Sequence, residues 1–133
     1  MANALSTQTL EDGDRNVVAK VTAVADTSDF ASTTVLDPAL LNATRPPTNQ
    51  LAVDEIQYSI EDGWQVELYW DATTPVLMTS LSGRGMFPVG PNYGGLQNNA
   101  GTGKTGKIKF LTIGYTSGTM VATLILHCHK QTV

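Results

Sequence analysis

The feature that most constrains this chain is a two-residue alternation of apolar and polar side chains in short runs. Residues 17–24 place a small apolar side chain at every second position. Residues 56–60 and 64–70 alternate in the same way, and the second run puts Trp64 and Trp70 on one face. Side chains two residues apart lie on the same face of a β-strand. The pattern therefore predicts strands with one buried face, and we expect both tryptophans to point into the core.

Turn signals separate these runs. Asp62-Gly63 lies between two of the predicted strands, and this dipeptide favours a two-residue type I′ hairpin. Further strands are predicted at 76–81, 108–115 and 119–129, with a weaker candidate at 30–36. The last two are separated by Thr116-Ser117-Gly118, which predicts a second hairpin.

Helical periodicity is nearly absent. Asp37-Pro38 offers a helix N-cap and first turn, and residues 44–47 would end that short helix. Six or seven short strands with turns between them favour an all-β fold, either an antiparallel β-sandwich or a small barrel. We predict one domain over residues 15–133.

Two segments do not fit the alternation. Residues 1–14 are polar and patternless, so they are predicted to form an extended N-terminal arm. Residues 83–106 hold eight of the 12 glycines and are predicted to be a long Gly-rich loop. Because that loop also carries large apolar side chains, we expect it to pack against another surface and not to be a solvated linker. The candidate interface residues are Leu5 and Leu10 in the arm, Met86, Phe87, Val89, Tyr93 and Leu96 in the loop, and Tyr69, which faces away from the tryptophans.

Charge and cysteine content limit the partners. The net charge is −4, and the densest basic group is Lys104, Lys107 and Lys109, so nucleic-acid binding is not predicted. Cys128 is the single cysteine, it falls in register with apolar positions, and it excludes an internal disulfide. Without a secretory signal or an apolar run long enough for a membrane helix, we expect synthesis in a cytoplasm and no membrane partner.

The Gly-rich stretch at residues 99–106 superficially resembles a phosphate-binding loop. That mechanism needs a glycine at position 98, which is asparagine, and a helix after Lys104-Thr105, where Gly106 and a strand follow instead. We therefore predict a turn and no nucleotide or other cofactor.

His127 and His129 form the one metal-like pattern. Two residues apart on a strand, their imidazoles could meet one ion, but a site would need an Asp or Glu from elsewhere. The alternative is a half-exposed edge strand, and no metal is predicted. The carboxylate pairs Asp54-Glu55 and Glu61-Asp62 would point to opposite faces, and no nucleophile elbow occurs. No catalytic residue is predicted, and the chain is not expected to be an enzyme.

Residues 56–125 resemble a group of small virion structural proteins of tailed bacteriophages. The resemblance rests on turn-rich phrases: IQYSI at 56–60, LYWDATTPVL at 68–77, LSGRG at 81–85, GGL at 94–96, NNAG at 98–101 and GYTSGT at 114–119. It implies a jelly-roll-like β-sandwich and a capsid cement or decoration protein. Such a protein would bind the outer surface of the major capsid protein shell, as a homodimer or homotrimer, and reside in the virion after synthesis in the host cytoplasm.

Three alternatives stay open at this point. A tail, neck or baseplate structural protein could share the fold. A carbohydrate-binding β-sandwich could use Tyr69 and Tyr93. A small metal-dependent enzyme would have to be built on His127 and His129.

Overall fold

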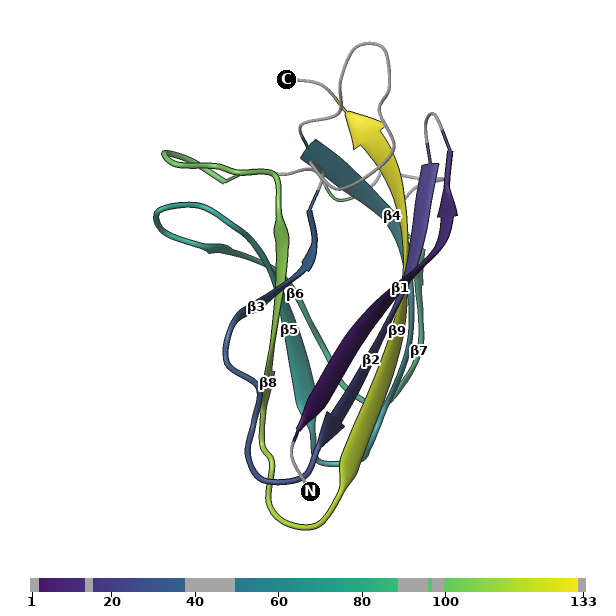
Figure 1. Cartoon of the computed structure of the whole chain (residues 1–133), viewed down its shortest axis with the longest axis vertical. Coiled ribbons are helices and arrows are strands. Elements are labelled where there is room, and N and C mark those ends of the chain that lie inside the picture. The colour runs from purple at the N-terminus through teal and green to yellow at the C-terminus, as the bar shows by residue number, and fades with distance from the viewer. Residues whose placement is uncertain (1–2, 14–15, 38–49, 89–95, 97–99, 132–133) are drawn as a thin grey trace.

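Nine β-strands and no helix occur in the residues that the computed structural model describes, which are 3–13, 16–37, 50–88, 96 and 100–131. The strands are β1 (Ala4–Asp12), β2 (Asn16–Ala25), β3 (Thr33–Leu36), β4 (Gln50–Ile60), β5 (Gln65–Trp70), β6 (Val76–Leu81), β7 (Arg84–Pro88), β8 (Ile108–Ile113) and β9 (Met120–Gln131). They form two antiparallel layers (Figure 1). Sheet A has the order β1-β2-β9-β4-β7, and sheet B has the order β3-β8-β5-β6.

The connections identify the type of sandwich. From β2 to β9 the chain changes sheet at every step except β5 to β6, which leaves four strands of this series in each sheet. Eight strands wound in this way form a jelly roll, and β1 adds a fifth strand to sheet A beside β2. The predicted all-β, antiparallel, jelly-roll-like sandwich is confirmed.

The core lies between the sheets and uses the side chains that the alternation singled out. Val17, Val21, Trp64 and Trp70 are at most 2% exposed. Cys128 is also buried among them, as predicted. Burial of one face of each strand supplies most of the driving force for folding.

Both predicted hairpins are wrong. The turn at Asp62-Gly63 exists: Trp64 N donates to Glu61 O at 3.1 Å, and Gly63 has a φ of +82° that favours glycine. However, β4 enters sheet A and β5 enters sheet B, so the turn joins the layers. The connection from β8 to β9 does the same. Alternation shows which side chains are buried, but it does not show which strand lies alongside.

The predicted N-terminal arm is wrong for residues 4–12. They form β1, which pairs antiparallel with β2 from Ala4↔Val24 to Asp12↔Val17. Asn3 fixes the start of the strand, because its side-chain oxygen accepts from Asp26 N at 2.7 Å and its amide donates to Ser28 O at 2.9 Å. Because β1 is an edge strand that is covered little on either face, its residues need not alternate between apolar and polar. The alternation therefore did not predict it.

The predicted 83–106 loop is wrong at residues 84–88, which form β7 against β4. Gly85 fits there because it lies opposite Tyr58, whose ring covers the position; a Cβ on Gly85 would be 3.0 Å from the Tyr58 hydroxyl oxygen. Leu96 pairs with Val53 through two backbone hydrogen bonds of 2.7 and 3.0 Å. The remaining loop positions, including Val89 and Tyr93, lie outside the described residues. The predicted helix after Asp37 also lies outside them.

Candidate functional site

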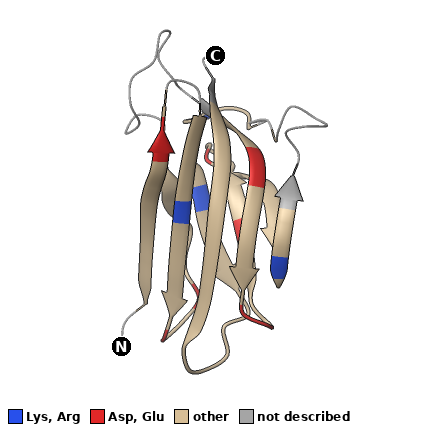
Figure 2. Ribbon diagram, turned by 90° about the vertical axis from the view of Figure 1, so that its right-hand side faces the viewer, with Lys and Arg blue, Asp and Glu red and all other residues tan. Residues whose placement is uncertain are grey.

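The outer face of sheet A is a broad surface with few charges (Figure 2). Its side chains follow from the register, because directly opposite residues in antiparallel strands share a face. Successive rows across the sheet are Ala4–Val24–Val121, Ser6–Thr22–Thr123–Ser59 and Gln8–Lys20–Ile125–Gln57. Strand β7 extends two of these rows, with Arg84 opposite Ser59 and Met86 opposite Gln57. Lys20 and Arg84 are the charged residues in these rows. We call these residues the sheet A face.

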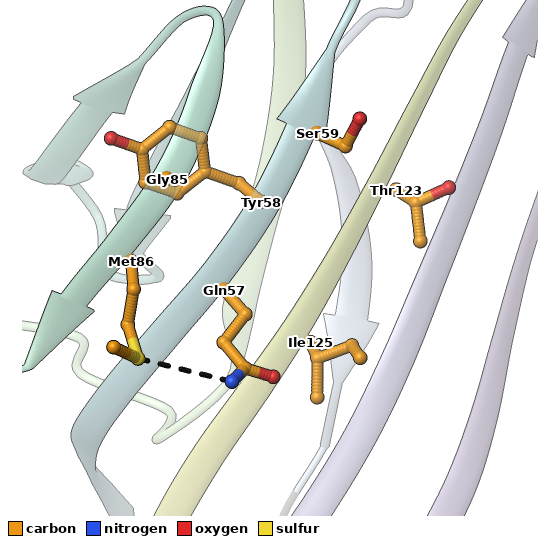
Figure 3. Close-up of a pocket in the computed structure, with 7 residues that line it drawn as sticks. All are labelled: Gln57, Tyr58, Ser59, Gly85, Met86, Thr123 and Ile125. Carbon is orange, nitrogen blue, oxygen red and sulfur yellow. Dashed lines mark hydrogen bonds between the residues drawn. The ribbon is translucent and has the colours of Figure 1, made fainter.

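A shallow depression of about 360 Å³ lies on this face between β4, β7 and β9. Figure 3 shows the side chains that line it. Its lining residues are Gln57, Tyr58, Ser59, Gly85, Met86, Thr123 and Ile125. Met86 is 55% exposed at its rim, and its sulfur accepts from Gln57 Nε2 at 3.8 Å. No lining side chain carries a charge, so the depression suits an uncharged group of a partner.

Apart from Lys20, the charged side chains of this face lie towards one end of its shorter strand β7 and on the first half of β4. Arg84 is at one end of β7, and Asp54 and Glu55 are on the opposite half of β4 (Figure 2). His129 Nδ1 lies 2.8 Å from Asp54 Oδ1, and His127 Nε2 lies 3.6 Å from Glu55 Oε2. The two imidazoles share a face, as the spacing predicted. The predicted edge strand is wrong, because β9 lies in the middle of sheet A between β2 and β4.

The two histidines have different carboxylate neighbours. Each lies beside its own carboxylate from β4, because Glu55 is opposite His127 and a bulge at Asp54 shifts the register. The prediction that Asp54 and Glu55 point to opposite faces is therefore wrong, since both contact histidines on one face. Over the described part of the chain, no three His, Cys, Asp or Glu side chains are grouped so that they could hold a metal ion. The arrangement supplies polar contacts at one end of the sheet A face.

The stretch that resembles a phosphate-binding loop is a turn packed on the β5–β6 connection. Lys104 N donates to Gly101 O at 3.2 Å, and Thr105 Oγ1 donates to Asp71 Oδ2 at 2.7 Å. Gly103 has a φ of +82°, and a Cβ there would collide with Thr73. Strand β8 follows, so no helix N-terminus faces this turn. The predicted turn is confirmed.

The candidate interface residues are scattered over the molecule. Leu5 and Leu96 pack against the core, whereas Leu10 is 49% exposed at the β1 edge and Met86 is on the sheet A face. Tyr69 lies on the outer face of sheet B, away from the tryptophans as predicted. The side chain of Phe87 and the residues Val89 and Tyr93 are outside what the structure describes.

Hydrogen bonds connect the side chains on the outer face of sheet B. Gln65 Nε2 donates to Ser80 Oγ at 2.6 Å, and the Tyr69 hydroxyl donates to Glu67 Oε1 at 3.0 Å. The Glu67 carboxylate raises the pKa of Tyr69, chiefly because it accepts this hydrogen bond from the neutral hydroxyl. The polar groups of this face are therefore engaged with one another.

Sequence reasoning missed the role of Asp29, whose carboxylate connects three other segments. Its carboxylate accepts from Trp64 Nε1 at 2.9 Å, Thr112 Oγ1 at 3.0 Å, Tyr115 N at 3.0 Å and Gly114 N at 3.1 Å. We call these five residues the Asp29 cluster. Both carboxylate oxygens of Asp29 therefore face protein donors. The partners are 35 to 86 residues away, so no local signal could have found them.

Cys128 lies on the core side of β9. Burial raises the pKa of its thiol to about 12, with a smaller contribution from Asp54. A neutral buried thiol is a poor nucleophile and a poor metal ligand. Within the described residues, no helix is long and apolar enough to cross a membrane.

Comparisons with known proteins leave the function open. No protein-family model matches the sequence, and no curated protein matches it. Among solved structures, the cupin domain of Drosophila melanogaster CENP-C is similar over 91% of this chain and 75% of that chain, with 7% identity and a TM-score of 0.33. A likeness this distant does not say what the chain does.

Proposed function

We propose that this chain is a non-enzymatic structural protein of a tailed-phage particle, namely a capsid cement or decoration protein. It binds the outer surface of the major capsid protein shell through the sheet A face and stabilises the shell. The assignment to a phage particle rests on the sequence resemblance. The charge-poor sheet A face, with its uncharged depression, is the observation that carries the mode of binding.

The chemistry of this face supports attachment to another protein. Exposed apolar groups such as Val121 and Met86, at 46% and 55% exposed, gain free energy when a partner covers them. The charges of this face on β4 and β7 would set the orientation of the partner more than the affinity. An acidic chain with net charge −4 also has little attraction for packaged nucleic acid.

The stabilisation would be mechanical. A protein that binds the assembled shell but not the separate coat subunits shifts the equilibrium towards the shell by mass action. A shell carrying this protein therefore melts at a higher temperature than a bare one.

The test adds purified protein to shells that lack it and measures occupancy and shell melting temperature. Two matched variants place the same charge on opposite faces: Ser59→Lys on the sheet A face and Ser80→Lys on the outer face of sheet B. We expect Ser59→Lys to reduce occupancy at least tenfold and Ser80→Lys to bind like the unaltered protein. Absence of binding by the unaltered protein, with an unchanged melting temperature, would refute the cement function. Equal binding by both variants would refute the assignment of the face.

Position on the particle distinguishes the nearest alternative. Many copies spread over the shell in a cryo-EM reconstruction support the cement function, whereas a few copies at one vertex or along the tail support a tail, neck or baseplate role. Glycan binding that is lost in Tyr69→Ala would instead support the carbohydrate-binding alternative.

A further inference from the structure

The edge of sheet A at β1 differs from the other sheet edges of the molecule. Natural proteins protect exposed edges with short strands, charges, prolines or bulges, because an open edge pairs with another strand. Strand β7 is five residues long, starts at Arg84 and ends at Pro88. In sheet B, β3 has four residues, and β6 follows Pro75 and pairs with β5 across a bulge.

Strand β1 has few of these protections. It is nine residues long, and residues 4–10 contain no charge, proline or glycine. Its register with β2 is regular from Ala4 to Thr9, and the one irregularity comes after that, before Glu11. A straight, uncharged edge of six residues is a template for strand addition.

We propose that β1 pairs antiparallel with β1 of a second copy, across a two-fold axis at Thr7. The pairing joins two copies of sheet A into one continuous ten-stranded sheet. It concerns the free protein and does not rest on the proposed function. Because self-pairing of antiparallel strands is isologous, it gives a dimer and excludes a trimer through this edge.

The sequence of β1 suits this register. With Thr7 opposite Thr7 of the second copy, Ser6 lies opposite Gln8 and Leu5 lies opposite Thr9. Threonine pairs and small polar pairs are favourable across antiparallel strands. Leu10, which is 49% exposed in the single chain, comes beside Ala4 of the second copy.

Charge disfavours a shift of the pairing towards the C-terminal end of β1. A shift of the axis to Gln8 would place Asp12 opposite Ala4 and Glu11 opposite Leu5, which desolvates carboxylates against apolar side chains. With the axis at Thr7, Glu11 falls beyond the paired segment, opposite Asn3. No like charges face each other in either half of the dimer.

The first test is a disulfide at the two-fold axis. Thr7→Cys places two thiols at directly opposite positions, where Cβ atoms are about 4.5–5.5 Å apart, close to the spacing of a disulfide. Thr9→Cys is the matched control on the same strand and face, because two such thiols would be separated by four residues along the strands, or about 13 Å. Cys128 is buried and does not compete. We expect covalent dimers from Thr7→Cys under mild oxidation and at least tenfold fewer from Thr9→Cys.

The second test is the oligomeric state by analytical ultracentrifugation at submillimolar concentration. We expect the unaltered protein to be a dimer and Thr7→Lys, which sets two lysines against each other, to have half that mass. Thr102→Lys, in an exposed turn, should remain a dimer. A monomer or trimer for the unaltered protein would overturn the proposal, as would equal cross-linking of the two cysteine variants. If a monomeric Thr7→Lys still binds shells, the proposed function does not require the β1 interface.

Discussion

The Asp29 cluster and the sheet A face use polar groups in opposite ways. In the Asp29 cluster one carboxylate accepts hydrogen bonds from two backbone and two side-chain donors of three other segments. On the sheet A face the Ser, Thr and Gln side chains of the rows face solvent beside apolar ones. The cluster connects segments of the two sheets at one end of the sandwich, whereas the side chains of the face point to solvent. Changes in the cluster should therefore affect stability, and changes on the face should affect association.

The largest expected effect is in the cluster. Asp29→Ala removes the acceptor of four hydrogen bonds and leaves partly buried donors without it, so we expect the free energy of unfolding to fall by about 3 kcal/mol. Urea denaturation followed by tryptophan fluorescence measures this. Asp62→Ala, in the exposed turn between β4 and β5, is the control and should change stability little. Equal losses in both variants would contradict the special role of the cluster.

The next prediction tests the contact between the turn at Gly63 and the β8–β9 connection at Gly114. Gly114 has a φ of +99°, and a Cβ there would be 2.8 Å from Gly63 O. Gly114→Ala is expected to cost about 2 kcal/mol of stability, from backbone strain and the close contact. Gly118→Ala shares the positive φ, at +71°, but meets nothing within 4 Å, and should cost about 1 kcal/mol. Thermal unfolding that ranks Gly118→Ala as the worse variant would show that the contact is not tight.

The third prediction tests whether water is excluded from the core around Cys128, which lies between His127 and His129 on the opposite side of β9. The pKa of Cys128 is raised from 9.0 to about 12 in the folded protein, so the folded state holds the proton while the unfolded state loses it. Stability is therefore fully present below pH 9 and falls between pH 9 and 12, by about 1.4 kcal/mol at pH 10. Cys128→Ala should lack this dependence. Parallel pH profiles for the two proteins, from chemical denaturation, would show that water reaches the thiol.

The smallest effect is on the sheet A face. Ser59→Lys should change the free energy of unfolding by less than about 0.5 kcal/mol, because the side chain is exposed. Under the proposed function, a loss of shell binding by this variant then reports a lost contact and not a folding defect. A destabilisation as large as that of Asp29→Ala would erase the distinction between the two regions.

Much of the fold was predictable from single strands. The alternation identified β2, β5, β8 and β9 and the burial of Trp64 and Trp70, because each strand has one apolar face. Which strands pair with each other was not predictable, although one feature of the sequence argued against the first hairpin. A two-residue turn at Asp62-Gly63 would set Ile60 opposite Gln65, a buried position against a half-buried polar one. The β8–β9 connection has no such feature.

The candidate site was predictable only in part. The shared face of His127 and His129 followed from their spacing, but their carboxylate partners depend on the bulge at Asp54. The sheet A face depends on rows of residues from five strands, of which only β1 and β2 are neighbours in sequence. The Asp29 cluster likewise depends on residues distant in sequence, which come together only when the layers close.

The position of β9 has a consequence for biosynthesis. This last strand lies in the middle of sheet A, between β2 and β4, and neither of those strands pairs with the other. Until the ribosome has delivered residues 120–131, the β1–β2 hairpin and the β4–β7 pair have no common neighbour. The nascent chain therefore cannot complete sheet A part-way through translation. Loss of this single strand by premature termination leaves sheet A as two separate halves.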